Sequence, residues 1–180
     1  MTLIYKNQIL LYSFIFLLGL ISSYSLPPYN LFFLNLFSYP AFLWVLLNYS
    51  KFKVRSFIIG WMFGFGYFIS NLYWITNSLT FEELFKPLIP FALVLIPLFL
   101  GLFYGLSTLT FSFLNPKKNF LSILMLVTSI SIFEYLRSFI FGGFPWNLIS
   151  FSFVSYLEFI QLLSITGTYA FNSIIILLFL

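Results

Sequence analysis

Residues 88–114 read LIPFALVLIPLFLGLFYGLSTLTFSFL, a run of 27 residues without one charged side chain. A helix needs about 20 mainly apolar residues to cross the hydrocarbon core of a bilayer, so this run is long enough to span a membrane. Over the whole 180-residue chain, 62% of residues are hydrophobic and 7% are charged, whereas soluble domains carry about 25% charged residues. The composition therefore predicts an all-α, polytopic membrane helix bundle, with residues 1–180 as one membrane domain.

Polar segments divide the chain into six apolar stretches, each of which we predict to be a transmembrane helix. The separating segments are SLPPYN at residues 25–30, the more polar stretches at residues 51–55, 77–86 and 115–119, and FGGFPWN at residues 141–147 with the softer stretch that follows it. Pro40 predicts a kink within the second helix, because proline breaks the helical hydrogen-bond ladder. The six predicted helices are residues 9–24, 31–49, 56–76, 88–114, 120–141 and 161 to the chain end.

The basic residues set the predicted orientation. With the N-terminus in the cytoplasm, six of the eight basic residues fall in cytoplasmic segments, as the positive-inside rule requires. Lys86 falls in an outer loop, and Arg137 lies within the fifth predicted helix. Because the basic residues are scattered rather than clustered on one face, we expect no nucleic-acid partner. The six cytoplasmic ones are Lys6, Lys51, Lys53, Arg55, Lys117 and Lys118.

The residue types present exclude several kinds of catalytic site within this chain. It has no cysteine and no histidine, so it contains neither a cysteine nucleophile nor the commonest general base. It has no Walker loop, no Gly-x-Ser-x-Gly elbow and no metal-ligand cluster. The only carboxylate side chains are those of Glu82, Glu83, Glu134 and Glu158, and the first two are typical of a solvated loop. We predict no cofactor, no metal site and no catalytic residue in this chain.

One charged pair lies inside the fifth predicted helix, where charges are costly. Glu134 and Arg137 are three residues apart and therefore share one face of that helix. One interpretation is a pair that neutralises itself and fixes helix packing, as intramembrane charges commonly do. The other is a site for a lipid headgroup near the outer interface, because the guanidinium of Arg can make two hydrogen bonds to a phosphate.

The turn FGGFPWN, residues 141–147, follows this pair directly. Its two glycines permit a tight or left-handed backbone, and Pro145 fixes its own φ. Trp146 is either an anchor at the membrane interface, where Trp is enriched, or part of a site. The candidates for contacts with lipid or with another domain are Glu134, Arg137, Gly143, Phe144, Pro145 and Trp146.

Two pairs of glycines have the spacing of closely packed membrane helices. Gly60 and Gly64 form a GxxxG motif in the third predicted helix, and Gly101 and Gly105 form another in the fourth. Small residues at this spacing let helices approach closely, so we predict a packing role for these four glycines rather than a direct role in ligand binding.

Several of these motifs together resemble a known family. EYLRSFIFGGFPWN at residues 134–147, followed by ITGTYAFN at residues 165–172, is similar to the membrane region of bacterial apolipoprotein N-acyltransferases. SLPPYN at residues 25–30 and GWMFGFGYFISNLYWI at residues 60–75 resemble the same family in the same order. The resemblance covers nearly the whole chain, and its most specific part is GFPW with the ExLR segment before it.

The resemblance implies an enzyme of lipoprotein maturation in the bacterial inner membrane. Such enzymes transfer an acyl chain from a phospholipid donor to the N-terminal amine of a diacylglyceryl-cysteine lipoprotein, through a thioester on a cysteine. A Glu-Lys-Cys triad carries this chemistry in a nitrilase-like domain that follows the membrane helices. This chain has no cysteine and ends before such a domain, so only the membrane scaffold that admits lipids carries over. The candidate residues are then expected near the outer face, where lipids enter.

The chain ends at Leu180 within the apolar run IIILLFL, so we expect a piece of a longer protein or of a split gene. Two other functions are compatible with the residues. One is a small transporter or channel subunit with Glu134 and Arg137 along a polar pathway, although the internal repeat that many transporters show is not evident. The other is a structural membrane protein without a ligand.

Overall fold

The computed structural model describes residues 8–49, 52–140, 142, 145 and 147–180, and the regular structure of these residues is entirely helical. This confirms the predicted all-α class. The α-helices are α2 (Gln8–Ser23), α3 (Asn35–Tyr49), α4 (Lys53–Asn71), α5 (Ile89–Phe113), α6 (Phe120–Ile140), α7 (Leu157–Ile160), α8 (Leu163–Thr166) and α9 (Thr168–Phe179). The 3-10 helices are η1 (Phe32–Leu34), η2 (Tyr73–Thr80), η3 (Glu83–Leu88) and η4 (Ile149–Phe153).

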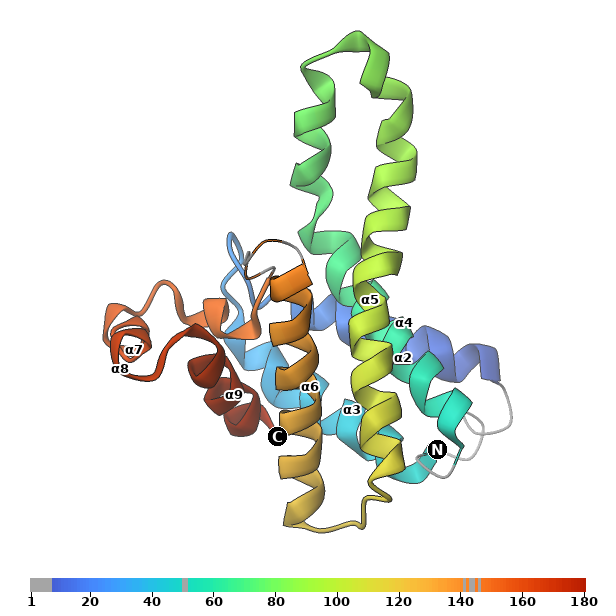
Figure 1. The fold of residues 1–180 in the computed structure, drawn as a ribbon, viewed down its shortest axis with the longest axis vertical. Helices are drawn as coiled ribbons and strands as arrows, with labels where there is room; N and C mark the ends of the chain where they lie inside the picture. Colours follow the sequence, from blue (N-terminus) through green and yellow to red (C-terminus); the bar gives the residue numbers. More distant parts are fainter. Residues whose placement is uncertain (1–7, 50–51, 141, 143–144, 146) are drawn as a thin grey trace.

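The centre of the bundle is the pair α4 and α5, with α2 against α4 and α6 against α5 (Figure 1). Helix α9 packs on α6, and α3 contacts both α2 and α9. The core between these helices is largely aromatic. The ring of Phe63 stacks on that of Phe42 with centroids 4.2 Å apart and lies 5.6 Å from the ring of Tyr104. Side chains from α3, α4 and α5 therefore meet at one buried centre.

The two predicted glycine pairs lie where α4 and α5 touch. A Cβ added at Gly64 would lie 2.9 Å from the Cα of Gly101 and 2.9 Å from the Cβ of Tyr104. A Cβ added at Gly105 would lie 2.9 Å from the ring of Phe57, and one at Gly60 would overlap Thr108. A larger residue at Gly60, Gly64 or Gly101 would therefore push the two helices apart, because the added Cβ meets backbone atoms of the other helix, whereas at Gly105 it meets only the Phe57 ring.

A second close approach joins α2 to α4, and the sequence reasoning missed it. A Cβ added at Gly19 would overlap the carbonyl of Phe63, and one added at Gly66 would overlap the carbonyl of Phe16. Gly19 and Gly66 do not belong to a GxxxG pair with each other, because they lie on different helices. Only the packing of the helices brings them into register.

A hairpin made of η2, η3 and the first turns of α5 projects from the bundle along its long axis (Figure 1). The sequence predicts a polar loop over residues 77–86, whereas the structure has 3-10 turns there. Hydroxyls stabilise this tighter helix, because each donates to the carbonyl three residues earlier. Thr76 donates to Tyr73 at 2.6 Å, and Ser78 donates to Ile75 at 2.7 Å.

Within the described residues, two helical segments are long and apolar enough to cross a membrane: Glu83–Phe113, with 31 residues, and Phe120–Ile140, with 21. A third candidate is the pair Lys53–Asn71 and Tyr73–Thr80, if these helices form one span with a bend of 49°. The structure therefore has two or three candidate spans by this measure, where the sequence predicts six. The shorter apolar helices are Gln8–Ser23, Phe32–Asn48, Leu157–Thr166 and Thr168–Phe179.

Local breaks explain why the remaining predicted helices are short. The third predicted helix ends as α4 at Asn71, where the chain bends into η2. The sixth is divided at Gly167, whose φ of 77° lies in the left-handed region that favours glycine. This break leaves α9 with 12 residues, which corresponds to a length of about 18 Å. Helix α3 contains Pro40 and continues on both sides of it, and a kink at this residue stays a prediction.

Candidate functional site

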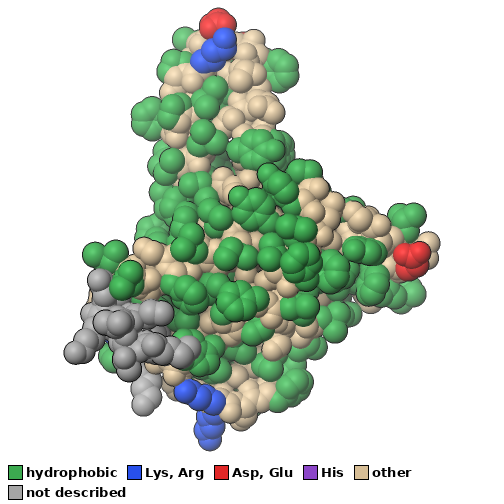
Figure 2. Space-filling model, turned by 180° about the vertical axis from the view of Figure 1, so that it is seen from behind, with side chains coloured by type: hydrophobic (Ala, Val, Ile, Leu, Met, Phe, Trp, Pro, Cys, Tyr) green, Lys and Arg blue, Asp and Glu red, His purple; other side chains and the backbone are tan. Residues whose placement is uncertain are grey.

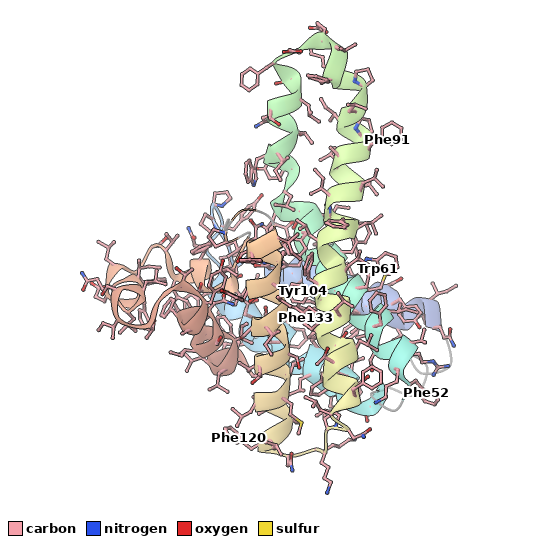
Figure 3. All side chains as sticks on the ribbon, viewed as in Figure 1. Phe52, Trp61, Phe91, Tyr104, Phe120 and Phe133 are labelled. Atoms are coloured by element: carbon pink, nitrogen blue, oxygen red, sulfur yellow. The ribbon has the colours of Figure 1, made fainter. Side chains whose placement is uncertain are left out.

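The carboxylate of Glu134 lies at the centre of the bundle and is 2% exposed. The hydroxyl of Tyr104 on α5, a residue labelled in Figure 3, donates to Glu134 Oε1 at 3.3 Å. The amide of Asn172 on α9 donates to Glu134 Oε2 at 2.5 Å. Both donors are neutral and both come from other helices, so Glu134 joins α5, α6 and α9 through hydrogen bonds.

The same asparagine extends this chain of hydrogen bonds to the backbone after the Phe-Pro-Trp turn. Asn172 Oδ1 accepts a hydrogen bond from the backbone N–H of Ser150 at 3.0 Å. Ser150 belongs to η4 and is fully buried. We call Tyr104, Glu134, Asn172 and Ser150 the Glu134 network. It connects the bundle centre to the segment that directly follows the turn.

Arg137 lies one turn further along α6 and is 1% exposed. Its guanidinium carbon lies 4.9 Å from the centroid of the Phe68 ring on α4, which is the geometry of a cation–π contact. The charge of Arg137 also acts on the Glu134 carboxylate through space. Both members of the predicted charged pair are therefore buried between helices, and each has contacts on a different neighbouring helix.

The turn after α6 is the part of the predicted site that the structure describes least. Gly143, Phe144 and Trp146 lie outside the described residues. Pro145 is half-buried, and Gly142 has a φ of 73°, as the sequence suggests for a tight glycine turn. The hydroxyl of Tyr67 on α4 donates to the carbonyl of Asn147 at 2.9 Å. This bond ties the end of the turn to α4.

A cavity of about 330 Å³ lies beside this turn. Its walls come from the segment after α2, the end of α4, the start of η2, and η4. The lining side chains are neutral, and most are aromatic, apolar or amide-bearing. They are Leu26, Pro27, Pro28, Tyr29, Ser70, Asn71, Tyr73, Trp74, Asn147, Phe151 and Val154. We call this space the turn cavity.

The turn cavity and the charged pair are separate features of the structure. Neither Glu134 nor Arg137 lines the cavity, although Asn147 does. Among the described residues, no three His, Cys, Asp or Glu side chains gather as metal ligands would. The surroundings of the cavity therefore suit hydrogen bonding and apolar contact rather than acid–base or metal chemistry.

Several residues that build this region were not singled out from the sequence. Tyr67, Tyr104, Asn147 and Asn172 connect the charged pair and the turn to the neighbouring helices. Their one common signal is a polar group within an apolar segment, and many other Ser, Asn and Tyr residues of this chain share it. The partners of Glu134 lie 30 and 38 residues away in sequence, so only the fold identifies them.

Known proteins match nearly all of this chain. The sequence model described as "Apolipoprotein N-acyltransferase N-terminal domain" matches residues 18–179. Proteins named apolipoprotein N-acyltransferase from Sinorhizobium fredii, Allorhizobium ampelinum and Brucella suis are 32%, 33% and 30% identical over 173, 170 and 173 residues. These alignments cover 91%, 89% and 91% of this chain, but 32% of each relative, so the chain spans about a third of their length. The chain belongs to the family of the apolipoprotein N-acyltransferase N-terminal domain.

Proposed function

We propose that this chain is the membrane part of an enzyme that moves an acyl chain from a phospholipid to the N-terminal amine of a diacylglyceryl-cysteine lipoprotein. The observation that carries the proposal is the family match over residues 18–179. The names of the matched relatives state an N-acyltransferase that acts on apolipoproteins. The apolar helices are compatible with a membrane protein, and we place it in the bacterial inner membrane.

The chemical step itself needs residues that this chain does not contain. It has no cysteine, and the acyl thioester implied by the family resemblance forms on one. We assign that step to a nitrilase-like domain, in the two thirds of the relatives' length that this chain does not span. The role proposed for the residues present here is to admit the lipid substrates and to orient them toward that domain.

A topology with six spans and a cytoplasmic N-terminus remains part of the proposal. This topology is supported by basic residues that gather at one end of the bundle. Lys53 at the start of α4 donates a hydrogen bond to the carbonyl of Ser112 near the end of α5, so these termini lie together. At the same end of the bundle, Lys118, just before α6, donates a hydrogen bond to Asn48 in the last turn of α3. The Phe-Pro-Trp turn follows the opposite end of α6 and would then face outward.

The turn cavity is the proposed place of lipid contact. Tyr and Trp side chains suit the depth of lipid headgroups, because one part of each is apolar and another part is polar. Tyr29, Tyr73 and Trp74 provide such groups, and Ser70 and Asn147 add neutral polar groups. Neutral hydrogen-bonding groups suit ester carbonyls and glycerol oxygens of a lipid better than they suit a bare phosphate. The cavity therefore fits the backbone region of a phospholipid or of a diacylglyceryl group.

The proposal is tested with the complete reading frame that encodes this chain. A frame that continues into a nitrilase-like domain with Glu, Lys and Cys supports it. A stop codon after Leu180, with no such domain encoded nearby, would refute the proposed enzyme. Activity is measured by mass spectrometry as the addition of one acyl chain to a diacylated lipoprotein peptide.

Two matched valines test the role of the cavity. Val154 lines the turn cavity and is 44% exposed, whereas Val94, on the projecting hairpin, is 43% exposed. Val154→Trp fills the cavity and is expected to lower acyl transfer about tenfold or more, because misplaced substrate reacts slowly. Val94→Trp is expected to leave transfer unchanged. Equal acyl-transfer activities of Val154→Trp and Val94→Trp, both well folded, would refute lipid contact at the turn cavity.

A further inference from the structure

The end of the bundle opposite the Phe-Pro-Trp turn carries only basic charges among the described residues. Lys53, Arg55, Lys117 and Lys118 lie there, and the described acidic residues lie on the hairpin, in the core and in α7. In Figure 2, the blue side chains at the lower end lie far from the red ones. No described acidic side chain therefore neutralises the positive charge at this end of the bundle.

The contacts of these cations lead to the same conclusion. Lys53 Nζ donates to the carbonyl of Ser112 and lies 4.8 Å from the centroid of the Phe113 ring. The guanidinium carbon of Arg55 lies 4.9 Å from the centroid of the Phe52 ring. These partners are backbone and aromatic groups, so they hold the side chains in place and leave their positive charge available to an anion.

A groove of about 350 Å³ opens at this end between α3 and the start of α6. Its apolar lining is formed by Leu43, Trp44, Leu47 and Ile123. Its polar lining is formed by Asn48, Lys118, Asn119 and Ser122, of which Lys118 and Asn119 are exposed and form its rim. We call it the basal groove. An apolar slot with a cation at its rim has the two features that an anionic lipid requires.

The ammonium of Lys118 is held at this rim by a neutral group. Lys118 Nζ donates to Asn48 Oδ1 at 2.9 Å, and Asn48 Nδ2 donates to the carbonyl of Trp44 at 2.7 Å. The second bond fixes the orientation of the amide, so that its oxygen faces Lys118. An ammonium has three N–H donors, and this contact uses one. The remaining donors and the full charge are available at the mouth of the groove.

We propose that the basal groove binds one anionic phospholipid, with its phosphate at Lys118 and an acyl chain along Leu43, Leu47 and Ile123. Basic pockets between membrane helices bind anionic headgroups in this way. A zwitterionic lipid binds less well, because its own ammonium is repelled by Lys118 and the neighbouring Lys117. This site lies at the other end of the bundle from the turn cavity and does not depend on the proposed acyl transfer.

The first test uses two adjacent lysines that differ in their relation to the groove. The purified 180-residue chain in detergent micelles is titrated with phosphatidylglycerol or phosphatidylethanolamine, and lipid adducts are counted by native mass spectrometry. A lysine near a membrane surface contributes about 1 kcal/mol of attraction for anionic lipid. Lys118→Gln is therefore expected to weaken phosphatidylglycerol binding about fivefold. Lys117→Gln removes the same charge outside the groove and should have a smaller effect.

A second variant tests the apolar part of the site without a change of charge. Ile123→Trp fills the apolar part of the groove and is expected to remove the phosphatidylglycerol adduct while size-exclusion and circular-dichroism profiles stay unchanged. Glycerol phosphate, which has the headgroup but no acyl chain, is expected not to bind. Equal losses in Lys117→Gln and Lys118→Gln would indicate diffuse attraction and overturn the proposal. Equal binding of the two lipids by the unaltered chain would also overturn it.

Discussion

The substitution Asn172→Leu tests whether the Glu134 network stabilises the bundle. Leucine has nearly the shape of asparagine but neither donates nor accepts hydrogen bonds. The change removes the 2.5 Å bond to Glu134 Oε2 and the 3.0 Å bond from the Ser150 backbone N–H. Both partners are buried, so water cannot replace the lost amide at either one.

The expected cost follows from these two bonds. A hydrogen bond to a charged group contributes about 1.5–3 kcal/mol, and a buried donor left without a partner costs about 1–3 kcal/mol. Hydrogen bonds between membrane helices are weaker than this on average, near 0.6 kcal/mol, because the unfolded chain in the membrane also finds partners. The leucine side chain is more apolar than that of asparagine, so its burial offsets part of this loss of stability. We therefore expect Asn172→Leu to lower the free energy of unfolding by about 2–4 kcal/mol.

The assay is unfolding in mixed micelles with increasing dodecyl sulfate, followed by tryptophan fluorescence and extrapolated to zero denaturant. The control is Asn71→Leu, because Asn71 Nδ2 donates at 3.2 Å to the carbonyl of Tyr67 in its own helix. The control should cost about 0.5 kcal/mol or less. Equal costs for Asn172→Leu and Asn71→Leu would refute the reasoning.

Four further predictions concern other residues. Gly64→Leu places side-chain atoms where a Cβ alone lies 2.9 Å from Gly101 Cα, so the dodecyl sulfate assay should record a loss of about 1–3 kcal/mol. Tyr67→Phe removes the hydrogen bond to the Asn147 carbonyl; we expect about 1 kcal/mol of lost stability and faster amide exchange at residues 147–151. Arg137→Ala leaves buried Glu134 without its nearby cation, so a loss of about 3 kcal/mol or more is expected in the same assay. Trp146→Ala in the full reading frame is instead expected to impair acyl transfer more than folding, measured by the peptide assay with circular dichroism as control.

The burial of Arg137 changes what its substitution can reveal. From the sequence, Arg137 was a candidate for direct contact with a lipid phosphate, and a loss of activity in Arg137→Ala would have supported that role. At 1% exposure, its loss is expected to disturb the bundle first. Activity of Arg137→Ala is therefore informative only beside a measured free energy of unfolding.

The sequence predicts the longest helices well, because charged or proline-containing segments bound them. The predicted helices at residues 88–114 and 120–141 correspond to α5 at Ile89–Phe113 and α6 at Phe120–Ile140. Hydrophobic periodicity gives no comparable signal at residues 73–88, where hydroxyl-to-carbonyl bonds favour 3-10 turns in place of a loop. Nor does it locate the break at Gly167, because a glycine within an apolar segment is equally compatible with a continuous helix.

For a related reason, the sequence does not identify the groups that surround the candidate site. The spacing of Glu134 and Arg137 correctly placed them on one helix, but spacing within a helix cannot say which helices lie opposite. The donors to Glu134 come from residues 30 and 38 positions away, on α5 and α9. The cavity beside the turn is assembled from segments even further apart, between Leu26 and Val154. Such sites depend on tertiary packing, which the pattern of a single segment does not encode.

The structural interpretation of Glu134 and Arg137, as a pair that fixes helix packing, is compatible with a functional one. If helix packing were the only requirement, apolar side chains of similar volume would serve as well as a buried carboxylate, or better. What a polar network adds is a fixed direction for its hydrogen bonds. In the Glu134 network, Asn172 accepts a hydrogen bond from the backbone N–H of Ser150. The Tyr67 hydroxyl donates to the carbonyl of Asn147, three residues before Ser150. Both bonds hold the backbone between the Phe-Pro-Trp turn and η4, which forms one wall of the turn cavity. The buried polar groups therefore hold in place one wall of the cavity that is proposed for lipid contact.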